Sequence, residues 1–296
     1  MFAGCSKKEQ PDIVVTMYAQ YDWVKQVLGS NPAGLSVGFL MSNGVDPHNY
    51  SPSARDIASI KSCKLFIYNG ASDSKWANDA MKNSRYKDRR VIGLMNHVVT
   101  KQIEWDDHDH EHDDDCFHGD IGDEHVWLSL RFARVFVQEI AEVLGRIDPV
   151  NEEYYMENAG IYRDELAALD TKYIQAVAEG NTDTVLFADR FPFFYMMEDY
   201  NLNWHAAFSG CSASVEISVS TLISLKQKVG QYGLDVILIL ENSANRKIAQ
   251  TIINDTTATK IREMDSIQSV NAKQAKNTSY IKIMEANLEV LKEALK

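Results

Sequence analysis

The stretch Asp12–Leu28, which reads DIVVTMYAQYDWVKQVL, sets the expectation for the fold class of this chain. Its first six residues form a run rich in β-branched side chains, typical of a buried strand, and Tyr18–Leu28 has the pattern of the helix after it. A buried strand followed directly by a helix is the unit from which parallel sheets covered by helices are built. In such sheets the functional residues gather at the carboxyl ends of the strands.

The same unit recurs in two groups along the chain. In the first group, strands are expected at Leu35–Met41, Leu65–Tyr68 and Arg90–Leu94, with helices from Ser53 to Lys61 and from Lys75 to Met81. In the second group, strands at Thr184–Ala188, Asn203–Phe208, Val236–Leu240 and near Ile261 alternate with helices up to Tyr200 and at Val219–Val229, Ala244–Asn254 and Ile281–Leu295. The sequence therefore predicts an α/β fold of two βα lobes with parallel sheets.

A long helical tract separates the two groups. Val150–Glu179 contains no proline and would span about 45 Å as a helix, so it is expected to be a rigid connecting helix. Trp127–Leu144, before it, also has helical spacing. The expected domains are a spacer at 1–11, an N-terminal lobe at 12–149 with a loop at 104–124, the connecting helix at 150–179 and a C-terminal lobe at 180–296. A ligand site is expected in the cleft between the lobes.

The net charge of −12 is concentrated in one segment of the 296 residues. Ten acidic residues fall between Asp106 and Glu124, and the rest of the chain has 32 acidic against 30 basic residues. This balance argues against a nucleic-acid partner, because no basic stripe is present to contact phosphates.

No apolar run approaches the roughly 20 residues that span a bilayer. The four cysteines include no C-x-x-C pair, which argues against a zinc ribbon.

The acidic segment also carries most of the histidines. Asp106–Trp127 reads DDHDHEHDDDCFHGDIGDEHVW and contains no lysine or arginine. Its five histidines are His108, His110, His112, His118 and His125. Imidazoles and carboxylates at this density are zinc-ligand chemistry, and a segment with so few apolar residues cannot pack into a core. The plainer alternative is an acidic surface loop with incidental histidines.

The N-terminus has small residues before a cysteine. Phe2-Ala3-Gly4-Cys5, followed by a polar spacer, resembles the tail of a bacterial lipoprotein signal in a trimmed form, with Cys5 as the lipidated residue. The alternative is an ordinary N-terminus with a free thiol.

Several motifs together indicate a family. The segment Gly44–Ile57, which reads GVDPHNYSPSARDI, is followed by Tyr68-Asn69-Gly70, by Trp76 and by Asp123–Leu128, which reads DEHVWL. This set resembles the zinc/manganese solute-binding proteins of bacterial ABC transporters, the cluster A-I metal-binding lipoproteins, over Asp12–Lys296. The segments FADRFPF at Phe187–Phe193 and FSGCS at Phe208–Ser212 are similar to a clostridial-type branch.

The resemblance implies a set of metal ligands. His48 matches the first family ligand, His125 the second and Asp265 the fourth, while the third falls on Ala188, which cannot bind a metal. Each ligand also has a plainer reading, since His48 and Asp265 could cap helices and His125 could be a surface residue.

The gap at Ala188 leaves several candidates for the third ligand. A water, a loop histidine, Asp189 or Glu216 could fill it. Glu216 is preferred over His205, which is expected early in its strand and hence at the opposite end of the sheet. In the branch, Cys211 would pair with a cysteine at the position of Ile267, so Cys211 is expected to be free or buried. Met196 and Met197 are expected in the core.

The resemblance implies an extracytoplasmic, lipid-anchored monomer that binds zinc, with manganese less favoured, and hands the ion to an ABC permease in the membrane. The histidine segment would raise the local zinc concentration, and binding should weaken below about pH 6.5, where imidazole protonates.

Two alternative functions remain open. One is a zinc hydrolase with Glu124 or Glu216 as general base, although the chain has no H-E-x-x-H sequence. The other is a surface adhesin in which the metal is structural.

Overall fold

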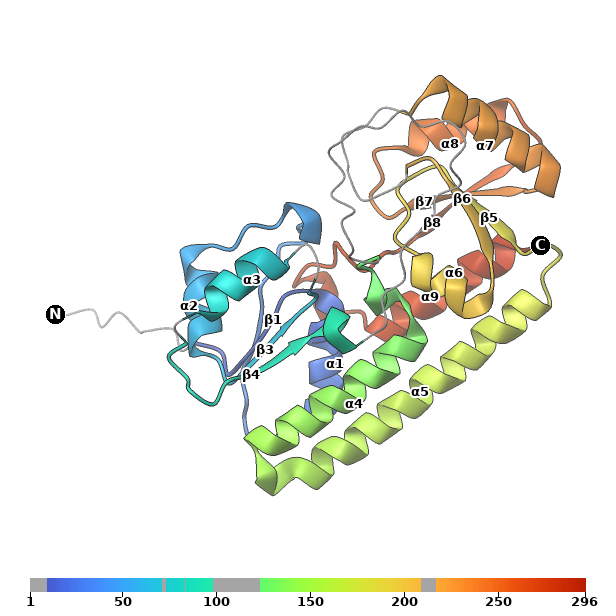
Figure 1. Cartoon of the computed structure of the whole chain (residues 1–296). Helices are drawn as coiled ribbons and strands as arrows, with labels where there is room; N and C mark the ends of the chain where they lie inside the picture. The colour runs from blue at the N-terminus through green and yellow to red at the C-terminus, as the bar shows by residue number, and fades with distance from the viewer. Residues whose placement is uncertain (1–9, 71–72, 83, 98–122, 209–216) are drawn as a thin grey trace. The chain divides into compact units, whose positions relative to one another are not determined.

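The computed structural model describes residues 10–70, 73–82, 84–97, 123–208 and 217–296. These residues form two compact units, each built around a parallel four-stranded sheet (Figure 1). Among the described residues, the first unit takes those within 10–97, 137–160 and 268–276, and the second those within 123–136, 161–267 and 277–296. The expected fold class of two parallel βα lobes is confirmed.

The sheet of the first unit has the strand order β2-β1-β3-β4. Its strands are β1 (Ile13–Val15), β2 (Val37–Phe39), β3 (Leu65–Tyr68) and β4 (Arg90–Gly93). The α-helices that accompany it are α1 (Tyr18–Leu28), α2 (Ala54–Ser62) and α3 (Ser74–Met81), with 3-10 turns η1 (Pro47–Asn49), η2 (Leu94–His97) and η5 (Gln274–Lys276). The central strand β1 pairs with both neighbours, since Val14 lies opposite Gly38 and Phe66.

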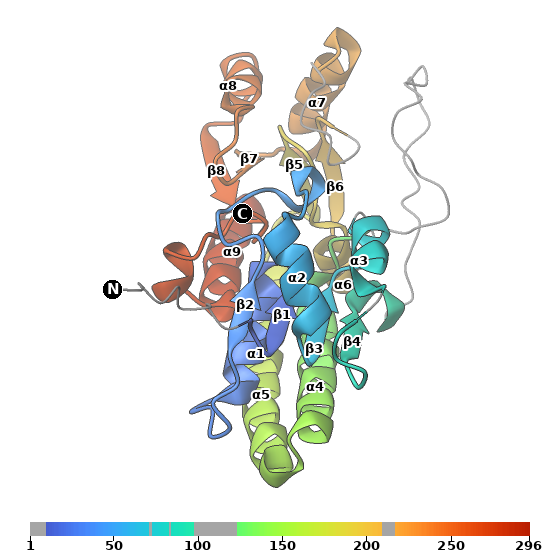
Figure 2. The ribbon, with the colours of Figure 1, turned by 90° about the vertical axis from the view of Figure 1, so that its left-hand side faces the viewer.

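The two faces of this sheet are covered by different helices. Val14 and Phe66 form one apolar cluster with Ile60 of α2 and Ala77 of α3. Figure 2 shows α2 and α3 on that face, whereas α1 lies on the other. The predicted start of α2 is confirmed, because Ser53 and Asp56 form a reciprocal capping box at its first turn.

The sheet of the second unit has the strand order β6-β5-β7-β8. Its strands are β5 (Thr184–Phe187), β6 (Asn203–Ala206), β7 (Val236–Leu240) and β8 (Lys260–Met264). The helices are α6 (Phe194–Tyr200), α7 (Val219–Tyr232), α8 (Arg246–Asn254) and α9 (Tyr280–Ala294), with the 3-10 turn η3 (Val126–Leu128). The fully apolar run Val236–Leu240 is buried along its length, as expected for a central parallel strand.

Helices again cover both faces of the second sheet. Leu225 of α7 and Ile252 of α8 pack with Leu186 and Ile239 in one core cluster. Figure 1 shows α6 and α9 on the opposite face. There the Tyr173 hydroxyl of the long helix α5 donates to the Met284 carbonyl of α9 at 2.6 Å. Met196 and Met197 are 1% and 0% exposed, so the prediction that they belong to the core is confirmed.

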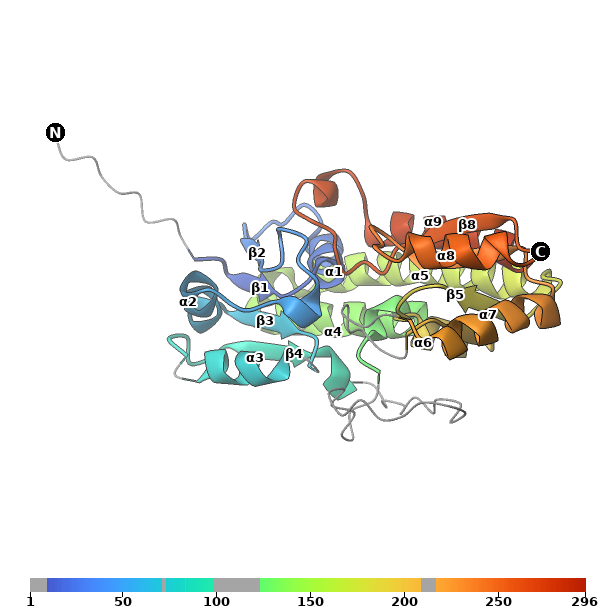
Figure 3. The same cartoon turned by 90° about the horizontal axis from the view of Figure 1, so that it is seen from above.

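Two long helices contribute to both units. They are α4 (Leu130–Ile147) and α5 (Glu152–Ala178), and the 3-10 turn η4 (Pro149–Asn151) precedes α5. In the first unit, the end of α4 and the start of α5 lie side by side (Figure 3), where Gln138 contacts Met156. The predicted connecting helix is confirmed, although η4 delays its start to Glu152. The boundaries proposed for the domains stay predictions. No helix among the described residues is long and apolar enough to span a membrane.

Candidate metal centre

His48 of the first unit lies in a short turn after β2. Pro47 starts the 3-10 turn η1, and the Asp46 carboxylate accepts a hydrogen bond from the His48 backbone N at 3.0 Å. Gly44, with φ of +75°, allows this loop to approach the Ser269 carbonyl, since a Cβ at position 44 would lie 2.7 Å from that oxygen. The turn is thus fixed against the segment 268–276 of its own unit.

One contact to the His48 ring comes from that same segment. Nε2 of Gln268 lies 3.5 Å from Nε2 of His48. Gln268 is only 5% exposed, whereas His48 is half-buried. The sequence reasoning did not single out Gln268, because a glutamine is a weak signal for a metal site.

His125 of the second unit is buried and held by a carboxylate. It is 1% exposed, so the alternative of a surface histidine is wrong. Asp123 accepts from the His125 backbone N at 2.9 Å, and both its carboxylate oxygens lie 3.2 Å from Nδ1 of the ring. The Tyr195 hydroxyl in turn donates to the Asp123 carbonyl at 2.9 Å. A carboxylate on Nδ1 fixes the ring and its tautomer, which makes Nε2 the nitrogen that would bind a metal.

Asp265 directly follows the last residue of β8. Its backbone exchanges two hydrogen bonds of 2.8 Å with the side-chain amide of Asn287 in α9. One carboxylate oxygen accepts from the Ile267 backbone N at 2.7 Å. Burial raises the pKa of the Asp265 carboxyl above its usual value, and the bond from Ile267 opposes that rise. Asp265 does not cap a helix, so that alternative is wrong; it sits at the carboxyl end of a parallel strand.

Glu241, at the end of the neighbouring strand β7, is a second carboxylate of this region. It accepts from Ser266, at 2.8 Å from the backbone N and 2.6 Å from the hydroxyl. Burial, followed by the negative charge of Asp265, raises the pKa of Glu241 to about 7. Sequence reasoning missed this residue, although its position right after the apolar run Val236–Leu240 was the available signal. Two neighbouring carboxyls withdrawn from water favour a nearby cation.

Trp127 connects the His125 turn to the Asp265 strand end. The two rings of His125 and Trp127 meet edge to face with centroids 5.1 Å apart. The Trp127 indole N–H donates to the Ser266 carbonyl at 2.9 Å. Ile267, next in the chain, has φ of +65°, a left-handed conformation that strains a β-branched residue. The second unit therefore holds His125 and the Asp265 region in one hydrogen-bonded structure.

The segment that aligns with the third family ligand offers no side chain for a metal. Ala188 is 0% exposed and part of the core. The neighbouring Asp189 is 1% exposed, and its oxygens accept from Leu240 N at 3.1 Å, from Asn245 Nδ2 at 2.8 Å and from the Ser243 hydroxyl. This carboxylate organises the loops after β5 and β7.

Most of the other predicted site residues cannot be placed by the described part of the chain. Glu216, the loop histidines His108, His110, His112 and His118, and the cysteines Cys5 and Cys211 are outside the described residues. The placement of His205 early in its strand is wrong: it is the third of four residues in β6, next to the carboxyl end. Its ring stacks on Tyr232 of α7 with centroids 5.5 Å apart.

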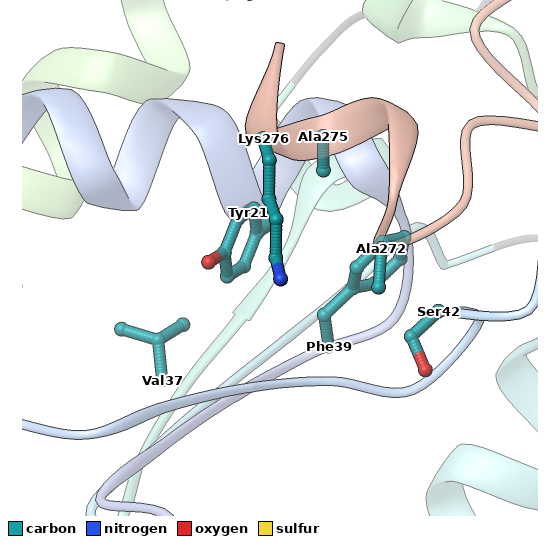
Figure 4. A pocket seen from close by; sticks show the side chains of 7 residues that line it. All are labelled: Tyr21, Val37, Phe39, Ser42, Ala272, Ala275 and Lys276. Atoms are coloured by element: carbon teal, nitrogen blue, oxygen red, sulfur yellow. The ribbon is translucent and has the colours of Figure 1, made fainter. Parts of the chain in front are cut away.

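Within either unit, the described residues bring no three His, Cys, Asp or Glu side chains close enough to hold a metal on their own. A surface pocket of about 230 Å³ does occur in the first unit. Figure 4 shows its lining side chains, which are Tyr21, Val37, Phe39, Ser42, Ala272, Ala275 and Lys276. The charged group that lines this pocket is the cationic Lys276, so it does not suit a metal ion.

The architecture defines the class of protein. Two parallel βα units sharing long helices, with histidines at 3-10 turns and carboxylates directly after strands β7 and β8, are the arrangement of a two-lobe solute-binding protein. The chain belongs to the family described as zinc-uptake complex component A, periplasmic (ZnuA), whose model matches residues 13–294.

Individual relatives agree with this membership. The chain is 29% identical over 98% of its length to the zinc-binding lipoprotein AdcA of Streptococcus pneumoniae, of which it spans 58%. It is also 29% identical to the high-affinity zinc uptake system protein ZnuA of Bacillus subtilis, of which it covers 89%.

Solved structures give the same picture. The Zn(II)-bound ZnuA-like domain of Streptococcus pneumoniae AdcA matches with a TM-score of 0.76 and 26% identity, covering 97% of this chain and 99% of that one. The metal-dependent lipoprotein YcdH of Bacillus subtilis matches with a TM-score of 0.78 and 27% identity, covering 96% and 98%.

Proposed function

We propose that this chain captures one zinc ion with His48, His125 and Asp265 and delivers it to an ABC-type importer. Two neutral imidazoles and a carboxylate are ligands that zinc accepts in a tetrahedral site. The imidazoles favour zinc over manganese, which prefers oxygen-rich surroundings. The family description and the names of the relatives from Streptococcus pneumoniae and Bacillus subtilis support the same ion.

The observation that carries the proposal is the set of contacts made by the segment Asp265–Gln268. In the second unit, Ser266 of this segment accepts from Trp127, whose ring touches His125. In the first unit, Gln268 lies 3.5 Å from Nε2 of His48. One short stretch of chain therefore contacts the neighbourhoods of both histidines.

Chain connectivity limits how far the ligands can separate. Gln268 follows Asp265 by three residues, a stretch that spans at most about 11 Å when fully extended. His48 contacts Gln268, so it is tethered to the region of the Asp265 carboxylate. This tether supports a single site that draws ligands from both units.

The electrostatics of the Asp265 region support a cation as the ligand. Burial raises the pKa of Asp265, and Glu241 nearby has its pKa raised to about 7. A divalent ion would stabilise both carboxylates in their charged form, which is the form that zinc requires. A neutral ligand would not stabilise the charged form of these two carboxylates in the same way.

The cellular role follows from the family. We infer an extracytoplasmic protein, attached to the membrane through a lipid on Cys5 and acting as a monomer with a permease partner. The lipoprotein names of relatives support the lipid anchor. The histidines at 108, 110, 112 and 118 would gather zinc near the site. No contact among the described residues specifically favours the hydrolase or the adhesin alternative.

Zinc titration of the full-length chain tests the proposal. The variant with His108, His110, His112 and His118 all changed to asparagine should still bind one zinc ion tightly, in competition with a chromophoric chelator. Adding H125A to that variant should remove the tight site. Tight binding that disappears with the four loop histidines and does not depend on His125 would refute the proposed site.

A further inference from the structure

The proposed zinc site lacks a third protein ligand at the position where the family supplies one. Ala188 carries only a methyl group and is 0% exposed. The adjacent Asp189 already accepts hydrogen bonds from Leu240, Ser243 and Asn245. A further protein ligand among the described residues would therefore come from another part of the chain, and this inference rests on the zinc site proposed above.

The distance between Gln268 and His48 is that of two ligands on one ion. Ligand atoms that each lie 2.0–2.2 Å from a tetrahedral zinc are about 3.3–3.6 Å apart. The end of the Gln268 amide lies 3.5 Å from Nε2 of His48, within this range and at the outer limit of a hydrogen bond. We propose that the Gln268 side-chain oxygen, Oε1, is a zinc ligand next to His48.

The burial of Gln268 suits this role. At 5% exposure the amide has little access to water, so an interaction between its oxygen and an ion would be weakly screened by solvent. A half-turn about the last side-chain bond exchanges the amide nitrogen and oxygen without moving the rest of the residue. Without metal, the amide N–H faces His48; with zinc bound, the turned amide presents Oε1 to the ion.

The position of Gln268 in the chain ties it to a ligand of the other unit. It follows Asp265 by three residues, and the strained Ile267 lies between them with φ of +65°. The Asp265 end of this segment is held by Asn287 and Glu241 through hydrogen bonds of 2.6–2.8 Å. One four-residue segment thus supplies a carboxylate and an amide oxygen, and the histidines supply the two nitrogens.

The ligand set of two nitrogens and two oxygens predicts how substitutions act. Leucine at position 268 is similar in bulk but offers no ligand atom, so Q268L should weaken zinc binding. Histidine offers a nitrogen that zinc prefers to an amide oxygen, so Q268H should bind zinc at least as tightly and discriminate more strongly against manganese. Gln250, an exposed amide of α8 that donates to Asn254, is the matched control position.

The test compares Q268L, Q268H and Q250L in the full-length chain whose four loop histidines are asparagine. Zinc affinity is measured by chelator competition, and the ligand set by the visible absorption spectrum of the Co(II)-loaded protein. Q268L should weaken zinc binding by tenfold or more and change the Co(II) spectrum. Q268H should retain or improve affinity with a shifted spectrum, and Q250L should match the parent in both.

The results distinguish failure of Gln268 as a ligand from failure of the proposed zinc site as a whole. An unchanged Co(II) spectrum in Q268L, with or without a loss of affinity, would overturn the assignment of Gln268 as a ligand. If Q268L does not fold, the Q268H spectrum decides, because an unshifted spectrum would also overturn it. A parent that binds no zinc tightly would overturn the proposed site itself, and the inference with it.

Discussion

The two histidines of the proposed site are held in different ways. His125 is 1% exposed, and a carboxylate contacts both its backbone and its ring. His48 is half-buried in a 3-10 turn, where the Asp46 carboxylate accepts from its backbone N. The second unit therefore presents a preorganised imidazole on a turn that Trp127 ties to the Asp265 strand end, whereas the first presents a half-buried imidazole on a 3-10 turn. A preorganised ligand loses less freedom on binding and contributes more to affinity.

Loss of the preorganised ligand should have the largest effect. In the full-length chain with asparagine at the four loop histidine positions, H125A should weaken zinc binding by more than about 100-fold, beyond the 10–100-fold typical of lost outer-shell partners. H48A should have a smaller effect, because less preorganisation is lost with it. Chelator competition measures both affinities. A loss of zinc affinity in H48A equal to that in H125A would contradict the proposed difference in preorganisation between the two histidines.

Asp123 and Asp46, the carboxylates that contact the two histidines, test the same difference in how firmly each histidine is held. D123N removes the charge that lies 3.2 Å from Nδ1 of His125, so zinc affinity should fall about tenfold or more. D46N keeps an oxygen that can accept the His48 backbone N–H, so affinity should change less than about threefold. Both variants are measured by the same competition assay. Equal losses of zinc affinity in D123N and D46N would show that the Asp123 carboxylate does not specifically strengthen zinc binding by His125.

Loss of the hydrogen bond from Trp127 should have the next largest effect on zinc affinity. W127F removes the indole N–H that donates to the Ser266 carbonyl at 2.9 Å while keeping an aromatic ring beside His125. We expect a loss of stability of about 1 kcal/mol and a zinc affinity reduced up to about tenfold. W204F is the matched control, since Trp204 stacks on Phe191 with centroids 3.7 Å apart. Zinc affinity that falls equally in W204F would show a general effect of tryptophan loss.

Asp199, behind the His125 turn, should have the smallest effect on zinc affinity and acts instead on the pH dependence of stability. Ser129 caps α4 and donates to Asp199 at 2.6 Å, and burial raises the pKa of Asp199 to about 6. The folded protein therefore holds this proton more tightly than the unfolded chain, in which an aspartate carboxyl has its ordinary pKa of about 3.9. The contribution of Asp199 to stability is most favourable below about pH 4 and is lost as the pH rises through about 6.

The variant D199N removes this pH dependence. Relative to the wild type, its melting temperature should rise by a few degrees between pH 4 and pH 7, corresponding to on the order of 1–3 kcal/mol. Thermal melts of the metal-free protein across that range measure the difference. D164N, which removes an exposed acid from α5, controls for the loss of one negative charge. A D199N difference that stays flat with pH would contradict the burial of a titrating Asp199.

Much of the fold could be predicted from the sequence because its strands are short apolar runs followed by helices. Leu65–Tyr68 and Val236–Leu240 have the predicted bounds, since both are central and buried. β6 ends at Ala206 instead of Phe208, because pairing with β5 stops at Phe187. The helix predicted from Trp127 begins at Leu130, because Val126–Leu128 forms a 3-10 turn and Ser129 supplies the cap.

The site was harder to predict than the fold. His125 and Asp265 lie beside apolar segments, and the resemblance to a family located them in the sequence. Glu241 and Gln268 have no such local signal, because their roles depend on contacts with Ser266 and His48 from distant parts of the chain. Periodicity predicts which strand end carries a polar residue, but only tertiary packing determines what that residue contacts.

A crystal of the zinc-loaded protein, measured with anomalous scattering at the zinc edge, would show whether His48, His125 and Asp265 bind one ion. We expect one strong peak within about 2.0–2.2 Å of the His48 and His125 Nε2 atoms and of an Asp265 carboxylate oxygen. Zinc peaks found only on histidines of the 104–124 segment, with none shared by His48, His125 and Asp265, would contradict it.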